Sequence, residues 1–138
     1  MTVDAERVHS LLERLRTTES ELRRLRSLGP SAVRDDPDRM NSVKYLFVVA
    51  AEVAIDTGQH VIAAEALEAP SSFAEVFRVL GDTGWLPMQL AEALGDMARF
   101  RNLLVHGYAD VDDDRVVQIL GERLDDLMRF RQRIAARV

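Results

Sequence analysis

The chain has 138 residues, of which 47% are hydrophobic and 30% are charged, and its formal net charge is -5 at pH 7. This length and apolar content suit one domain with a single core, so we expect residues 1–138 to form one helical domain. The absence of cysteine excludes disulfides and thiolate metal sites, and the acidic balance disfavours a protein that holds nucleic acid over a broad basic surface.

The first predicted helix spans about residues 2–27 and carries its apolar side chains on one face. Charges run throughout this segment and leave no continuous apolar stretch of the kind found in secretory signals, so we expect a cytoplasmic protein. Gly29 and Pro30 should end the helix, and residues 31–38 should form a loop.

The second predicted helix covers about residues 37–65, with Asp36 as N-cap and Pro37 at the first helical position. Its middle, YLFVVAAEVAI, is apolar nearly all round, which predicts the most buried element of the fold. The longest apolar run, residues 45–51, is too short to span a bilayer, so we expect no membrane association. Gly58 marks a position where this helix can bend or divide.

Three polar residues of this second helix, Glu52, Asp56 and His60, follow one another at spacings of four and therefore form a polar ridge on one face. We expect ion pairs within or between helices, with Glu52 or Asp56 as a counter-ion for Arg101. A metal site is the alternative, but the Glu-x-x-His pairs of dimetal bundles are absent, and we expect no metal.

Ser72 and Glu75, three residues apart, fit a capping box that starts a short third helix ending at Val79. Gly81 and Gly84 should terminate it.

The fourth predicted helix, residues 87–106, is preceded by Trp85 and Leu86, which should fill the core where the chain turns. Two rows of apolar residues give this helix a wide apolar face. Such a face suits a central bundle helix or one that also meets a second subunit. The rows consist of Leu90, Leu94, Met97 and Leu104, and of Ala93, Met97, Phe100 and Leu104.

After the fourth helix, one of the aspartates at 112–114 should cap a fifth helix that continues to the C-terminus. No strand-like alternation of polar and apolar residues appears anywhere. The predicted fold class is therefore all-α, an antiparallel up-and-down bundle of four longer helices with one short helix inserted.

The end of the fourth helix gathers polar groups in an aliphatic neighbourhood. Arg101 falls on the apolar seam, where a guanidinium needs a carboxylate, an interface or a ligand. Asn102 and His106 are four apart and share one face of the helix. His106 lies in the last turn before Gly107, where the helix dipole favours the imidazolium, and Tyr108 follows on what should be an exposed turn.

Spacing alone leaves a structural role open for these residues, with Arg101 paired inside the bundle, His106 capping the helix and Tyr108 covering an edge. Arg101 and His106 also diverge by about 140° on a straight helix. Either the helix loosens before Gly107, or the site lies in a cleft between two copies related by a two-fold axis.

The segment RNLLVHGY, residues 101–108, resembles the R-x4-H signature of HEPN domains, and specifically the R-N-x-x-x-H-x-Y form of the HepT toxins. The preceding PSSFAEVFRVLGDTGWLP extends the likeness to nearly the whole chain. The resemblance implies a HEPN-like fold, a homodimer whose cleft is lined by the fourth helix, and the toxin of a type VII-like toxin–antitoxin module that acts as a metal-independent endoribonuclease without a cofactor.

The site has the parts for RNA cleavage, in which the ribose 2′-hydroxyl attacks the adjacent phosphate. His106 would be the general base or acid, Arg101 would hold the phosphate and stabilise its developing charge, and Asn102 would donate to the phosphate or fix the imidazole.

The resemblance also implies a partner, the minimal nucleotidyltransferase antitoxin MntA, which transfers AMP from ATP to the tyrosine of the motif. That tyrosine is Tyr108 here. Added phosphates beside Arg101 and His106 would occupy the phosphate site and repel RNA. The alternative function is a non-catalytic HEPN partner or substrate-recognition subunit of a minimal nucleotidyltransferase.

Overall fold

The computed structural model describes residues 2–107 and 110–138, and these residues form helices and connecting turns without any strand. The predicted all-α class is thereby confirmed. Where five helices were predicted, the described residues contain seven: α1 Ala5–Ser27, α2 Pro30–Arg34, α3 Pro37–Ala64, α4 Phe73–Asp82, α5 Met88–His106, α6 Asp113–Glu122 and α7 Leu124–Ala135.

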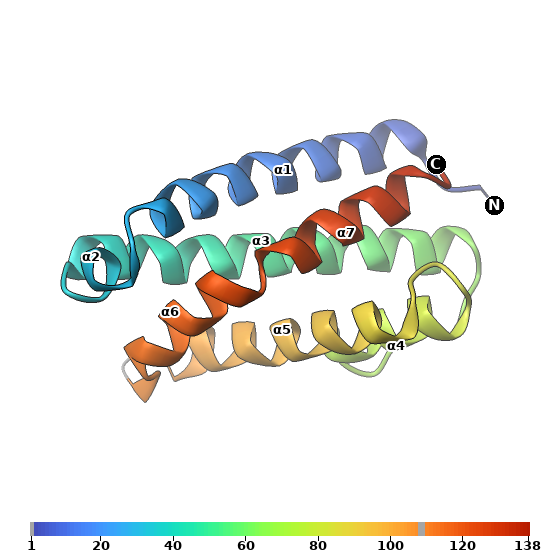
Figure 1. Cartoon of the computed structure of the whole chain (residues 1–138). Coiled ribbons are helices and arrows are strands. Elements are labelled where there is room, and N and C mark those ends of the chain that lie inside the picture. Colours follow the sequence, from blue (N-terminus) through green and yellow to red (C-terminus); the bar gives the residue numbers. More distant parts are fainter. Residues whose placement is uncertain (1, 108–109) are drawn as a thin grey trace.

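The long helices α1, α3, α5 and α7 lie side by side, with α2 at one end of the molecule (Figure 1). Helix α3 packs against every other helix and has the largest set of buried side chains. Although α3 is long and apolar enough to cross a membrane, 56% of its most apolar stretch is buried within the protein. Length and composition are therefore weak evidence for a membrane span, because the core helix of a soluble protein passes the same test.

Helix starts follow the predicted caps closely. The Asp36 carboxylate accepts hydrogen bonds from the first backbone N–H groups of α3, and Asp112 does the same for α6. The Ser72 hydroxyl accepts from the backbone N–H of Glu75, as predicted. The other half of the capping box is shifted by one residue, because the Glu75 carboxylate accepts from Ser71.

Three predictions about helix boundaries are wrong, one of them being the end of α4, which lies at Asp82 instead of Val79. Residues 31–34 of the segment predicted as a loop, residues 31–38, belong to the short helix α2, whereas α3 begins at Pro37 as predicted. The predicted fifth helix is divided at Arg123, which ends α6 and precedes α7. The division lets α6 pack against α2 while α7 packs against α1 and α5, so each half buries its own apolar stripe.

Gly58 and Gly81 serve packing and do not break their helices. A Cβ atom on Gly58 would lie 2.5 Å from Val76, and one on Gly81 would lie 2.8 Å from the Cβ of Ala91. Helix α3 therefore continues through Gly58, and α4 continues past Val79 to Asp82. The missing side chains allow α4 to approach α3 and α5 closely.

The core also encloses an ion pair between α1 and α7. The Glu19 side chain is only 2% exposed, and both of its oxygens accept hydrogen bonds from Arg131, with Nη2 at 3.2 Å from Oε1. Trp85 and Leu86 are buried at the turn between α4 and α5, as the sequence predicts.

Candidate functional site

Arg101, on the last turns of α5, makes polar contacts with two neighbouring side chains. Its Nη2 donates a hydrogen bond to Glu52 Oε1 of α3 at 2.7 Å, and its Nη1 donates to Asn102 Oδ1 at 3.0 Å. The Arg101 side chain is 14% exposed, whereas that of Glu52 is 47% exposed. Of the two carboxylates considered as counter-ions in the sequence, the structure pairs Glu52 with Arg101.

Phe73, the first residue of α4, completes the surroundings of Arg101. Its ring centre lies 5.2 Å from the guanidinium carbon of Arg101, a cation–π distance. The Arg101 Nε atom is buried and has no hydrogen-bond partner among the described residues. Glu52, Phe73 and Asn102 thus hold the guanidinium in one orientation, with donor capacity left for a ligand. No local pattern in the sequence indicates the contact between Arg101 and Phe73, because the two residues are 28 positions apart.

The other groups of the motif lie at the end of α5. Asn102 is half-buried and His106 is exposed in the last turn, directly before the C-cap Gly107. No hydrogen bond joins Arg101 and His106 within the described residues, consistent with their divergence on one helix. Tyr108, proposed from the sequence as the modified residue, lies outside the described residues.

The three residues of the polar ridge on α3 have separate surroundings. Glu52 pairs with Arg101, Asp56 is exposed, and His60 Nε2 accepts a hydrogen bond from the backbone N–H of Asp4 at 3.1 Å. Within residues 2–107 and 110–138, no group of three acidic or histidine side chains is arranged to hold a metal ion.

Exposed apolar side chains continue the surface on which Arg101 lies. Helices α3 and α5 run in opposite directions (Figure 1), so Tyr45, seven residues before Glu52, and Val105, four residues after Arg101, extend in the same direction from the ion pair. Tyr45 is 66% exposed and Val105 is 44% exposed. We call the surface formed by Tyr45, Glu52, Arg101 and Val105 the α3–α5 face.

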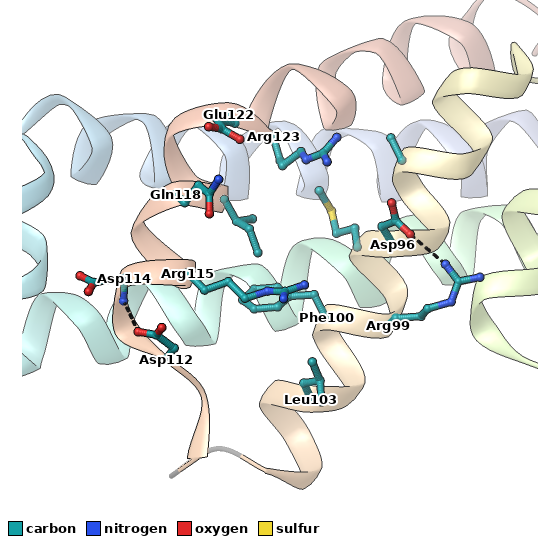
Figure 2. A pocket seen from close by; sticks show the side chains of 13 residues that line it. Asp96, Arg99, Phe100, Leu103, Asp112, Asp114, Arg115, Gln118, Glu122 and Arg123 are labelled. Carbon is teal, nitrogen blue, oxygen red and sulfur yellow. Dashed lines mark hydrogen bonds and ion pairs between the residues drawn. The ribbon is translucent and has the colours of Figure 1, made fainter.

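A separate hollow of about 610 Å³ lies between α5 and α6. Figure 2 shows Arg115 and Arg123 reaching from the α6 side, with the Asp96–Arg99 pair on the α5 side. Its rim carries both signs of charge, with Asp112, Asp114 and Glu122 among the acidic groups, so it offers no uniform field for an anion.

Several solved structures share this fold. The tri-AMPylated HEPN toxin of Shewanella oneidensis, solved with an MNT antitoxin, matches with a TM-score of 0.87 and 22% identity over 94% of this chain and 96% of that chain. YutE from Bacillus subtilis, described as a cytosolic protein of unknown function, matches with a TM-score of 0.84 and 16% identity over 97% of this chain and 90% of that chain. The fold is therefore that of HEPN proteins.

The chain belongs to the ribonuclease HepT-like family, whose model matches residues 3–134. It is also 29% identical over 79 residues to the mRNA nuclease HepT of Shewanella oneidensis, over 57% of this chain and 59% of that protein. The matching segment thus spans about three fifths of that curated relative. The resemblance to HepT toxins that the motif RNLLVHGY indicated is confirmed.

Proposed function

We propose that the chain is the toxin of a toxin–antitoxin module and acts as a metal-independent endoribonuclease. The observation that carries the proposal is the fixed guanidinium of Arg101 on the family motif, held by Glu52, Phe73 and Asn102 with donor capacity to spare. Membership of the HepT-like family and the curated mRNA nuclease relative support the choice of RNA as substrate.

The chemistry follows from the residue types. His106 removes the proton of a ribose 2′-hydroxyl, whose oxygen forms a bond to the adjacent phosphorus while the bond to the 5′-oxygen breaks. The products are a 2′,3′-cyclic phosphate and a 5′-hydroxyl, which requires one proton at the leaving oxygen. Arg101 donates hydrogen bonds to the phosphate oxygens as negative charge builds on them, and Asn102 positions Arg101 through its side-chain oxygen.

A homodimer would bring the side chains of Arg101 and His106 together in one site. In one chain His106 and Arg101 diverge, but two copies joined across a two-fold axis would place two of each in one cleft, so that one His106 could act as base and the other as acid. The exposed Tyr45 and Val105 on the α3–α5 face favour burial of this surface. The dimer, the single domain over residues 1–138, the antiparallel bundle of four longer helices and a cytoplasmic location are parts of this proposal.

The proposal is tested with two oligonucleotides of one sequence, one of RNA and one fully 2′-O-methylated, incubated with the purified chain in EDTA. We expect cleavage of the RNA and none of the methylated strand, because the nucleophile is blocked in the latter. Mass spectrometry should find a cyclic phosphate on the 5′ product. If the RNA stays intact while the chain still binds a nucleotidyltransferase, the function is that of a non-catalytic partner subunit.

We further propose that a nucleotidyltransferase antitoxin of the MntA type neutralises the chain by adding AMP to Tyr108. The AMPylated state and the antitoxin complex of the HEPN toxin with the same fold support this proposal. We expect the intact mass to rise by AMP units when the chain is incubated with the antitoxin and ATP, with no rise in Tyr108→Phe. Tyr45→Phe is the matched control and should be modified like the unaltered chain. Modification that persists in Tyr108→Phe would contradict the assignment.

A further inference from the structure

A second pocket, of about 470 Å³, lies between the first half of α5 and helix α7. Three arginines, Arg123, Arg129 and Arg133, and one acidic residue, Asp126, line it, together with Gln89, Gln132 and the apolar Leu90. In a chain with a net charge of -5, this is a local concentration of positive charge. Such a concentration favours an anionic ligand.

The three arginines have unused hydrogen-bonding capacity. Arg123 and Arg129 each form an ion pair with an oxygen of Asp126 at 3.7 Å, a distance too long for a hydrogen bond. Arg133 has no ion pair within the described residues. The exposed arginines outside this pocket commonly have closer partners, as Arg78 does with Asp82 at 2.7 Å. Each guanidinium carries five N–H donors in a fork that matches phosphate oxygens, and the long ion pairs leave most of these donors available.

Asp126 differs from the three arginines that line the pocket because it is acidic and largely buried. Its residue surface is only 8% exposed, and its Oδ2 atom has no hydrogen-bond partner among residues 2–107 and 110–138. Burial raises the pKa of the Asp126 carboxyl, and the nearby Arg123 and Arg129 only partly oppose this. A buried carboxylate oxygen without a donor is stabilised by a hydroxyl group that donates to it.

We propose that this pocket is a second binding site, specific for a ribose-phosphate unit, in which Arg123, Arg129 and Arg133 hold the phosphate and Asp126 accepts a hydrogen bond from a ribose hydroxyl. The pocket combines guanidinium donors that make no hydrogen bond within the described residues with one carboxylate that can accept from a hydroxyl. This combination matches a ribose-phosphate, which carries an anion and neutral hydroxyls close together. The unit comes either from an RNA strand or from a free nucleotide. The proposal does not depend on the ribonuclease activity of the chain.

The test is titration of the whole chain, labelled with nitrogen-15, with AMP, inorganic phosphate and a short RNA at low salt. All titrations are repeated in Arg101→Ala, which removes the phosphate contact of the cleavage site. We expect amide shifts in residues 123–133 and around Leu90 in both backgrounds. AMP should bind more tightly than inorganic phosphate because only AMP reaches Asp126, and 2′,3′-dideoxy-AMP should bind several-fold more weakly than AMP.

The double variant Arg129→Gln/Arg133→Gln should weaken AMP binding about tenfold or more. The matched control Arg7→Gln/Arg14→Gln removes two exposed arginines of α1 and should change the affinity less than about twofold. Binding of AMP and RNA would identify a site open to both sources, and binding of RNA alone would identify the polymer as ligand. Unchanged affinity in the pocket variant, shifts confined to other helices, or equal affinity for phosphate and AMP would overturn the proposal.

Discussion

Removal of either Arg101 or His106 is expected to reduce RNA cleavage by about 100-fold or more while leaving the fold intact. Arg101→Ala deletes the guanidinium donors aimed at the phosphate, and loss of one such donor typically lowers a rate by about 10²–10³. The fold should survive, because the carboxylate left behind, Glu52, has a side chain that is 47% exposed and stays hydrated. Arg101→Lys should recover only part of the rate, since an ammonium cannot reproduce the planar contacts to Glu52 and Asn102.

His106→Ala removes the proposed acid and base and should lower the rate by a similar or larger factor. The measurement is the single-turnover rate on a fluorescent RNA in EDTA, with circular dichroism of each variant to confirm its helix content. Glu52→Gln is the matched control. Its amide oxygen can still accept from Arg101, so the rate should stay within about tenfold of the unaltered chain. Cleavage that persists in both Arg101→Ala and His106→Ala would remove these residues from the reaction.

Glu19→Ala is expected to destabilise the chain by about 3–5 kcal/mol, because it leaves the Arg131 guanidinium facing the core without its carboxylate. The Glu19 side chain is 2% exposed and both of its oxygens are bonded to Arg131, whose side chain is 22% exposed. For a chain of this length the loss corresponds to a fall in Tm of roughly 10 °C or more. Urea titration and thermal unfolding followed by circular dichroism would measure it.

Two further variants separate the buried pair from exposed ones on the same helix. Glu13→Ala breaks the exposed pair of Glu13 with Arg16 and should change Tm little, because solvent screens such pairs. The double variant Glu19→Met/Arg131→Met should recover much of the lost stability, since it removes both buried charges together. A small effect of Glu19→Ala, comparable to that of Glu13→Ala, would show that the buried pair contributes little.

Local signals in the sequence determined the helical class, most helix starts and the position of the motif. A cap such as Asp36 or Asp112 acts on backbone N–H groups two or three residues away, so its effect is visible in a short stretch of sequence. Gly107 is the C-cap of α5 directly after His106, and its backbone N–H donates to the carbonyl oxygen of Leu103, four residues earlier. The extended motif of residues 101–108 then sufficed to indicate the family, because its residue types and spacings are all contained in one segment.

Contacts between helices were decided only by the tertiary structure. The spacing in the sequence predicted that Glu52 and Asp56 lie on one ridge of α3. The rotation and register of α3 against α5 determine that Glu52 is the carboxylate that pairs with Arg101. The same packing places the Phe73 ring against the Arg101 guanidinium. Gly58, where the sequence predicted a bend, is instead the position at which α4 approaches α3 closely. It also divided the last helix at Arg123 and gathered the arginines around Asp126. These features depend on side chains that are far apart in the chain. Which of these side chains come into contact depends on how the helices pack to bury their apolar faces, and the spacing of residues within one segment does not determine this packing.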